Sequence, residues 1–254
     1  MNELDVARNA AEQAGEAIIG VQDKQFDVER KDDDSPVTKA DHAASKIIHD
    51  WLDDTPHGII DEETEPTVTD SDTTWIVDPL DGTKEFIRGG DEYTVNIALV
   101  RDGTPVLGVV HQPKTNDTYT AVEDQAWKND AEITPSDTPL DEAVVAVSNS
   151  HPDDELNAFL DHTGVKGMRG IGSSLKGCKV AAGDVDAYPR FQELYSWDVA
   201  AMHAILQGAG CQMTTWDDTS IRHGNGRIPA FIAAHPSLHD AFLDAYKAWS
   251  PKHT

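Results

Sequence analysis

WIVDPLDGTKEF, residues 75–86, places two aspartates directly after an apolar run that is typical of a buried strand. Asp78 and Asp81 lie three positions apart with a proline between them, so both carboxylates can face one pocket and hold a hard cation through oxygen. Gly82 allows close approach to the backbone, and together with Thr83 it can begin a helical turn whose N–H groups receive a phosphate. An ordinary acidic turn is the alternative, because Asp, Pro and Gly are common in turns.

Periodicity predicts the elements on either side of this stretch. Apolar residues recur at helical spacing over 3–20, and a second helix runs from a possible capping box at Thr38 and Asp41 to about residue 54. A short apolar piece, 58–60, then leads into an acidic loop, 61–72. After the stretch, alternation predicts an antiparallel meander with strands at 93–100, 105–113, 117–122 and 125–130.

The pattern changes from about residue 143, where apolar runs and helical stripes begin to alternate in the manner of an α/β unit. The expected elements are strands at 143–150, 211–216 and 229–235, a turn at 170–174, and helices at 152–161, 174–182, 197–208 and 236–249. We therefore expect two lobes, an N-terminal α+β lobe over 1–138 and a C-terminal α/β lobe over 139–254. The boundary falls in the polar, proline-containing segment 135–142.

The charge balance excludes several classes of protein. The 254 residues include 46 Asp+Glu against 20 Lys+Arg, a formal net charge of −26, which repels nucleic acid polymers and anionic lipid. No apolar run is long enough for a membrane helix, the N-terminus lacks a signal-sequence pattern, and Cys178 and Cys211 suit reduced packing residues, so we expect a cytoplasmic protein. The acid excess is typical either of adaptation to high salt or of an acidic cytosolic protein.

Further acids suit the same chemistry, although each has a simpler explanation. Glu62 lies in an Asp-Glu-Glu run that is usually a solvated loop, and Asp198 begins a predicted helix, where aspartate is usually a cap. The spacing of Asp78 and Asp81 differs from the two-residue spacing of haloacid-dehalogenase phosphatases, and the chain has neither an EF-hand loop nor a P-loop motif. Any phosphate chemistry must therefore depend on metal.

The joint order of these segments resembles the inositol monophosphatase superfamily. The matching segments are DSPVTKADHAA (34–44), IIDEE (59–63), WIVDPLDGTKEF (75–86) and WDVAA (197–201). Five more are most similar to its 3′(2′),5′-bisphosphate nucleotidase branch: TVNIALV (94–100), LGVVHQP (107–113), SNSHPDDEL (148–156), GIGSSLKGC (170–178) and YPRF (188–191). The resemblance covers about residues 5–235 and implies a layered α/β (α+β) sandwich of the sugar-phosphatase type.

The resemblance also implies a site with two or three Mg²⁺ ions. Glu62, Asp78 and the Leu80 carbonyl would hold one ion, and Asp78, Asp81 and Asp198 would hold a second. Thr83, hydrogen-bonded to Asp41, would orient the attacking water and help deprotonate it, a role that competes with the capping box at Asp41. Glu62, Asp41 and Thr83 are thus the expected catalytic set.

On the substrate side, the resemblance implies a small nucleotide bisphosphate as partner. The expected contacts are Gly82, Thr83, Ser148, His151, Ser173, Lys176 and Arg190. The implied reaction is lithium-sensitive, Mg²⁺-dependent removal of the 3′-phosphate of adenosine 3′,5′-bisphosphate, with possible action on 3′-phosphoadenylyl sulfate. Asp61 and Asn149 depart from the family pattern, which has serine and a basic residue there.

Alternatives remain open at this point. An inositol or fructose bisphosphate phosphatase would use the same metals, and a catalytically silent metal and nucleotide binder would carry the same ligands. Family relatives also suggest peripheral association with the inner membrane, which nothing in the composition supports. The sequence predicts no oligomeric state.

Overall fold

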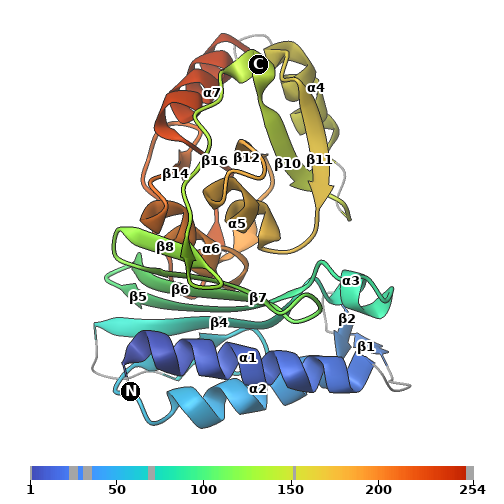
Figure 1. The fold of residues 1–254 in the computed structure, drawn as a ribbon, viewed down its shortest axis with the longest axis vertical. Coiled ribbons are helices and arrows are strands. Elements are labelled where there is room, and N and C mark those ends of the chain that lie inside the picture. Colours follow the sequence, from blue (N-terminus) through green and yellow to red (C-terminus); the bar gives the residue numbers. More distant parts are fainter. Residues whose placement is uncertain (1, 23–27, 31–35, 68–71, 151–152, 250–254) are drawn as a thin grey trace.

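The computed structural model describes residues 2–22, 28–30, 36–67, 72–150 and 153–249. Five layers follow one another in it, helix, sheet, helix, sheet and helix, as Figure 1 shows. This is the layered α/β sandwich expected from the sequence. Among the described residues, no helix has the length and apolar character needed to cross a membrane.

Two helices form the first layer. Helix α1 (Glu3–Gln22) buries a stripe of alanines, and α2 (Lys39–Leu52) packs beside it. The predicted capping box begins α2, because the Thr38 hydroxyl accepts from Ala40 N while Asp41 accepts from Thr38 N at 2.7 Å. The strands β1 (Val28–Arg30) and β2 (Pro36–Thr38) pair just before this helix.

A seven-stranded sheet forms the second layer, in the order β3 to β9. Its strands are β3 (Gly58–Asp61), β4 (Thr73–Asp81), β5 (Thr94–Arg101), β6 (Thr104–Gln112), β7 (Asp117–Val122), β8 (Gln125–Lys128) and β9 (Ala131–Glu132). The pairs from β4 to β9 are antiparallel, which confirms the predicted meander, and β3 pairs parallel to β4. The carboxyl ends of β3 and β4 therefore meet at one edge of the sheet, where Glu62 and Asp78 lie.

The remaining layers come from the rest of the chain. The second sheet has the order β11 (Gly167–Ile171), β10 (Val144–Ser148), β12 (Ala187–Arg190), β16 (Phe231–Ala234) and β14 (Gln212–Thr215). Between the two sheets lie α5 (Leu175–Ala181) and α6 (Ser196–Gly208), and α4 (Asp154–Thr163) and α7 (Pro236–Trp249) cover the outer face. Shorter elements are α3 (Thr83–Ile87), the 3₁₀ turn Leu140–Glu142, and the paired strands β13 (Leu194–Tyr195) and β15 (Arg227–Ile228).

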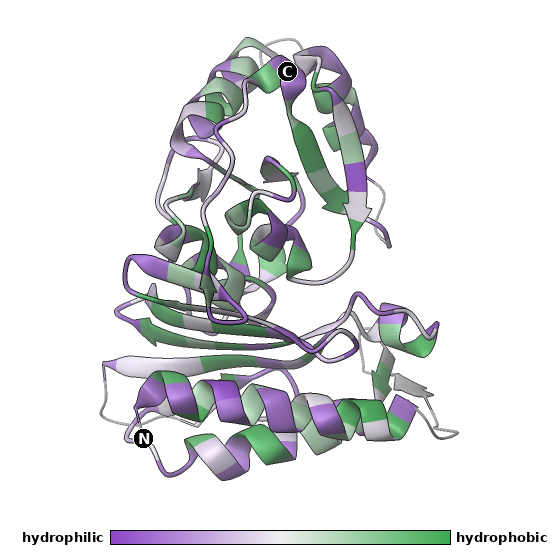
Figure 2. Cartoon of the chain, viewed as in Figure 1, coloured by the Kyte–Doolittle hydropathy of each residue, from purple (hydrophilic) through white to green (hydrophobic). Residues whose placement is uncertain are grey.

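Three apolar clusters hold the layers together. One joins α1 and α2 to the first sheet, a second joins that sheet to α5 and α6, and a third lies between the second sheet and α4 and α7. Hydrophilic and hydrophobic bands alternate along α1 in Figure 2, as expected for an amphipathic surface helix. The middle cluster draws residues from both halves of the chain, so α6 rests directly on β5 and β6.

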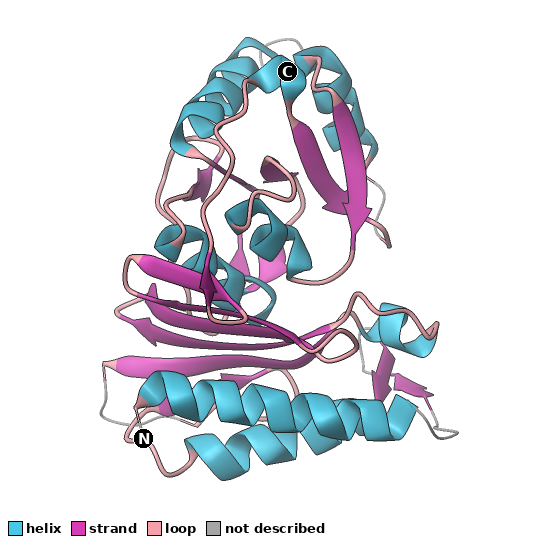
Figure 3. Cartoon of the chain, viewed as in Figure 1, coloured by secondary structure: helices cyan, strands magenta, loops and turns pink. Residues whose placement is uncertain are grey.

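Some local features differ from the sequence prediction (Figure 3). The expected turn at 170–174 begins only at Gly172, because residues 167–171 form strand β11. This edge strand is mostly exposed and rich in glycine, so it lacks the apolar alternation that reveals a strand. The expected lobe boundary lies in the connection between β9 and β10, and the division into lobes 1–138 and 139–254 stays a prediction.

Candidate active site

A bulge at the end of β4 sets the position of both aspartates. Asp78 pairs with Asn96 of β5 and Asp81 pairs with Thr94, so two residues of β4 oppose one residue of its neighbour and β4 carries one extra residue. Pro79 cannot donate a ladder hydrogen bond, which favours such a bulge at this point. The Asp78 carboxylate accepts from Leu80 N at 3.0 Å, which fixes the turn.

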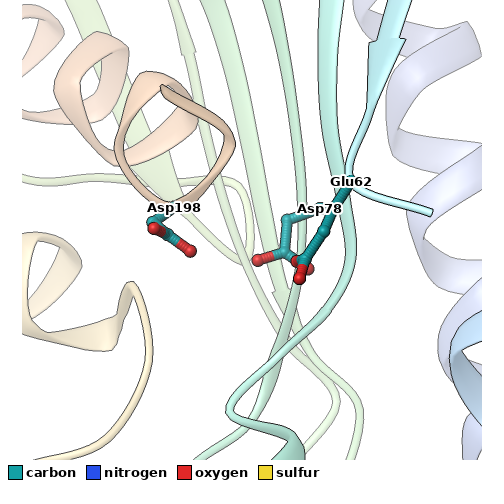
Figure 4. Close-up of side chains that lie close together, drawn as sticks. All are labelled: Glu62, Asp78 and Asp198. Atoms are coloured by element: carbon teal, nitrogen blue, oxygen red, sulfur yellow. The ribbon is translucent and has the colours of Figure 1, made fainter. Parts of the chain in front are cut away.

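Three carboxylates converge on one point in front of this bulge. Ligand oxygens of Glu62, Asp78 and Asp198 all lie within 4.8 Å of one another. Figure 4 shows Glu62 and Asp78 side by side at the strand ends, with Asp198 opposite them at the start of α6. Because β3, β4 and α6 are fixed by the core, the three oxygens are brought together by the fold and not by a local loop.

The electrostatics of this acidic cluster fit a bound cation. Burial, followed by repulsion from Glu62, Asp81 and Asp198, raises the pKa of Asp78 well above its ordinary value. Burial and the charges of Asp81 and Glu62 raise the pKa of Asp198 to about 8. Oxygen ligands that are buried and crowded in this way suit a hard divalent ion, whose charge would offset their repulsion.

Asp81 is held differently, by a serine and an asparagine that the sequence analysis did not select. Its Oδ2 accepts from Ser174 N at 2.6 Å and from the Asn96 amide at 3.3 Å, and the Ser174 hydroxyl lies 2.9 Å away. The same hydroxyl lies 2.8 Å from the carbonyl oxygen of Asp198. Ser174 thus links two expected metal ligands. The sequence signal for this residue is the pair of serines, Ser173 and Ser174, in the predicted turn.

Thr83 and Asp41 are in contact, as expected. The Thr83 hydroxyl lies 3.4 Å from Asp41 Oδ1 and 3.2 Å from the Leu80 carbonyl oxygen, so it can donate to either. Asp41 caps α2 with its other oxygen, Oδ2, so the capping contact and the contact with Thr83 coexist. Burial raises the pKa of Asp41 above its ordinary value despite the hydrogen bonds from Thr38.

Gly82 adopts φ +89°, in which a side chain would press against the Glu92 carbonyl.

A cavity of about 420 Å³ contains most of the other expected residues. Its lining includes Glu62, Asp78, Leu80, Asp81, Gly82, Thr83, Ser148, Ser173, Lys176, Arg190 and Asp198. Asp41 lies behind Thr83 and is buried, and His151 lies outside the described residues. The cavity therefore joins the acidic cluster to two of the chain's few cations.

The two cations are both fixed by backbone carbonyls. The Lys176 ammonium donates to Ser173 O at 2.6 Å and to Ile171 O at 3.3 Å, and Arg190 Nε donates to Gln192 O at 3.0 Å. Lys176 lowers the pKa of Asp81, and Arg190 lowers that of Asp198, against the larger effect of burial. Lys176 is thus a buried residue and not the solvated helix residue that its type alone suggests.

Asp61, which departs from the family pattern, turns away from the acidic cluster. Its Oδ2 accepts from the Ser45 hydroxyl at 2.7 Å and lies 3.1 Å from His49 Nε2, and its Oδ1 accepts from Glu63 N. The hydrogen bond with Asp61 raises the pKa of His49. The Asp61 carboxylate is thus hydrogen-bonded to neighbouring residues and stabilises the turn that carries Glu62.

Comparison with known proteins decides the family. The inositol monophosphatase family profile matches residues 2–248. This chain belongs to that family. It is 43% identical over 227 residues to the 3′(2′),5′-bisphosphate nucleotidase CysQ of Salmonella typhimurium, covering 86% of this chain and 92% of the relative.

Solved structures agree with this assignment. A CysQ structure from Bacteroides thetaiotaomicron matches with a TM-score of 0.78 and 32% identity, over 91% of this chain and 96% of that one. The extragenic suppressor protein suhB from Bartonella henselae matches with a TM-score of 0.85 and 28% identity, over 96% and 97%. This chain therefore has the fold of the inositol monophosphatase family and belongs to its class of enzyme, the phosphatases.

Proposed function

We propose that this protein removes the 3′-phosphate of adenosine 3′,5′-bisphosphate and yields AMP and phosphate. The observation that carries the proposal is a single cavity in which Glu62, Asp78 and Asp198 share space with Lys176 and Arg190. A bisphosphate needs two anion sites, one for each phosphate, and the cavity offers an acidic cluster for metal at one and fixed cations for the other. The relatives named 3′(2′),5′-bisphosphate nucleotidase support the nucleotide as substrate.

Mg²⁺ is the proposed metal. Glu62, Asp78 and the Leu80 carbonyl would hold one ion, and Asp78, Asp81 and Asp198 would hold a second, because all of these groups border the cavity. When bound, these ions would supply positive charge to the phosphoryl oxygens and acidify a water molecule.

The chain's own residues then orient the water. Thr83 Oγ1 would accept a hydrogen bond from the water while donating its proton to Asp41 Oδ1, which lies 3.4 Å away. Because burial raises the pKa of Asp41, that carboxylate is a better proton acceptor than an exposed one. Asp41 and Thr83 thus form a relay at the floor of the cavity.

The remaining polar residues of the cavity would hold the nucleotide. Ser148, Ser173, Lys176 and Arg190 line the cavity, and Gly82 gives the substrate room beside the backbone. His151, inhibition by lithium, action on 3′-phosphoadenylyl sulfate and a cytoplasmic location stay predictions. The two buried, free cysteines accord with that location.

Asp81→Asn tests the metal assignment. It removes a ligand charge with little change of shape, so we expect the release of phosphate from adenosine 3′,5′-bisphosphate to be abolished while the fold is kept. The matched control is Asp124→Asn, an exposed acid away from the cavity, which we expect to leave turnover unchanged. Near-normal turnover by Asp81→Asn at saturating Mg²⁺ would refute the site, and chromatography of the product identifies which phosphate leaves.

A further inference from the structure

An arginine that the proposed chemistry does not use lies on the wall of the same cavity. Arg227, on β15, lines the cavity together with Tyr195 and Trp197. The Arg227 guanidinium carbon lies 4.5 Å from the centre of the Tyr195 ring, and one of its nitrogens donates to the Tyr195 hydroxyl at 3.3 Å. Tyr195 in turn stacks on Trp197, with ring centres 4.5 Å apart and planes within 6° of parallel.

This arrangement fixes a cation that is otherwise exposed. An arginine on the surface normally samples many rotamers, and a cation–π contact with a hydrogen bond to the same ring reduces that freedom. A guanidinium has five N–H donors, and the contact with the Tyr195 hydroxyl accounts for one of them. The fork therefore keeps donors available for a planar pair of oxygens, which is the geometry of phosphate recognition.

The stack is also tied to the acidic cluster. Tyr195 and Arg227 are directly paired in the ribbon of β13 and β15, and Ser196 N donates to Gly226 O at 2.9 Å. Tyr195 N donates to the Asp198 carboxylate at 2.8 Å, so the residue beneath the guanidinium also holds a proposed metal ligand. One rigid unit thus sets the separation between the guanidinium and the acidic cluster.

The cavity is lined by more acidic than basic side chains, so a further fixed cation would favour the binding of a phosphate. The acids lining the cavity are Glu62, Asp78, Asp81, Glu85, Glu193 and Asp198, and the cations are Lys84, Lys176, Arg190 and Arg227. Bound metal would offset the acidic cluster for the cleaved phosphate, but a second phosphate must find its own positive charge. Two of the three donors of Lys176 are taken by backbone carbonyls, so Lys176 offers few further contacts, whereas Arg190 and Arg227 each give one of five donors to the contacts described above.

We propose that Arg227, held by Tyr195, is a specificity-determining residue that contacts the phosphate that is not cleaved. The inference rests on the proposed function and extends it, because it adds a third cation to Lys176 and Arg190 and makes the preference for a bisphosphate depend on β15. The aromatic pair acts as a positioning device and does not touch the reacting atoms.

Steady-state kinetics of Arg227→Gln test the proposal. We expect KM for adenosine 3′,5′-bisphosphate to rise roughly ten- to hundredfold, the usual range for a hydrogen bond to a charged group, with kcat within about twofold. The inhibition constant of 5′-AMP, which keeps the uncleaved phosphate, should rise in parallel, whereas the Mg²⁺ activation curve stays unchanged. Tyr195→Leu removes the ring under the guanidinium and should shift KM in the direction of Arg227→Gln, whereas Tyr195→Phe keeps the ring, loses only the hydroxyl contact and should shift KM less.

Arg101→Gln is the matched control. Arg101 is exposed and pairs with Thr73 at the far end of β4 from Asp81, so its loss should leave KM unchanged. If wild type hydrolyses the nucleotide and Arg227→Gln keeps the wild-type KM and inhibition constant, this inference fails and the proposed function stands. A parallel rise in KM for Arg101→Gln would show a general charge effect and overturn the local assignment. No turnover of the nucleotide by wild type would refute the proposed function itself.

Discussion

The carboxylates of Asp41 and Asp198 each combine a helix-capping contact with a place in the candidate site. Asp41 uses Oδ2 to cap α2 and offers Oδ1 to Thr83. Asp198 accepts from Tyr195 N as a helix cap does, and still lies in the acidic cluster. The capping role and the proposed role in the site therefore do not exclude each other. The capping contact instead fixes the orientation of each side chain.

Thr83→Val tests the proposed relay at this scale. Valine keeps the shape of threonine but removes the hydroxyl that would hold the water, so we expect kcat to fall roughly a hundred- to ten-thousandfold, as for loss of a positioned proton-transfer group. Thr83→Ser keeps the hydroxyl and should retain most of the rate. The measurement is kcat at saturating Mg²⁺ for both variants. A kcat of Thr83→Val close to that of Thr83→Ser would contradict the relay.

The raised pKa values of Asp78 and Asp198 predict how metal affinity and stability depend on pH. Without metal, folded-state pKa values above the unfolded ones mean that these groups favour folding below about pH 4, and that this contribution is lost as pH rises through the folded value, about 8 for Asp198. We therefore expect the metal-free protein to lose stability as pH rises from about 4 to about 8.

Mg²⁺ should reverse this trend, because it binds the ionised carboxylates and displaces their protons. The increase in Tm on adding Mg²⁺ should be larger at pH 8.5 than at pH 6.5, and calorimetry in buffers of different ionisation enthalpy should detect released protons. An equal increase in Tm at both pH values, without proton release, would show that these carboxylates do not bind the ion.

At the scale of elements, the site depends on how closely α6 approaches the first sheet. A Cβ on Gly108 of β6 would lie against the Ala201 carbonyl and 2.8 Å from Ala204 Cβ, so only glycine allows this approach. Because α6 carries Asp198 and β4 carries Asp78, the spacing between helix and sheet also sets the spacing of the acidic cluster.

Gly108→Ala should therefore harm both stability and metal binding. We expect a loss of about 1–3 kcal/mol in the free energy of unfolding, typical of overpacking, together with a weaker apparent affinity for Mg²⁺. Gly20→Ala in α1, where a Cβ meets nothing within 4 Å, is the control and should gain about 0.5–1 kcal/mol. Urea unfolding and Mg²⁺ titration measure the two effects. If Gly108→Ala is destabilised but keeps its Mg²⁺ affinity, the approach of α6 to the sheet does not control the spacing of the metal ligands.

Elements with strong periodicity were predictable, and those formed by tertiary pairing were not. The helices at α1 and α2 and the meander follow from repeated apolar residues, and their observed bounds lie within a few residues of the expected ones. Strand β11 and the ribbon of β13 and β15 are short and lack a repeating apolar pattern, so their pairing partners define them. For the same reason Tyr195 and Arg227 had no signal as site residues, because the contact between them spans 32 residues of sequence.

At the scale of the whole molecule, the net charge of −26 affects where an anionic substrate can bind. A strongly acidic protein disfavours anionic ligands at most of its surface, so the few cations that border the cavity and any bound metal decide where a phosphate can settle. The layering also forms the site, because the carboxyl ends of β3 and β4 meet the start of α6 where that helix packs on the first sheet. We therefore predict that this one cavity, when it holds metal, acts on a nucleotide bisphosphate.

Phosphate release tests that claim most directly. The measurement compares kcat/KM for adenosine 3′,5′-bisphosphate, inositol 1-phosphate and fructose 1,6-bisphosphate, each with Mg²⁺ and with excess EDTA. We predict a clear preference for the nucleotide that EDTA abolishes. Preference for either sugar phosphate, release that survives EDTA, or no release from any of the three would contradict a metal-dependent nucleotide phosphatase.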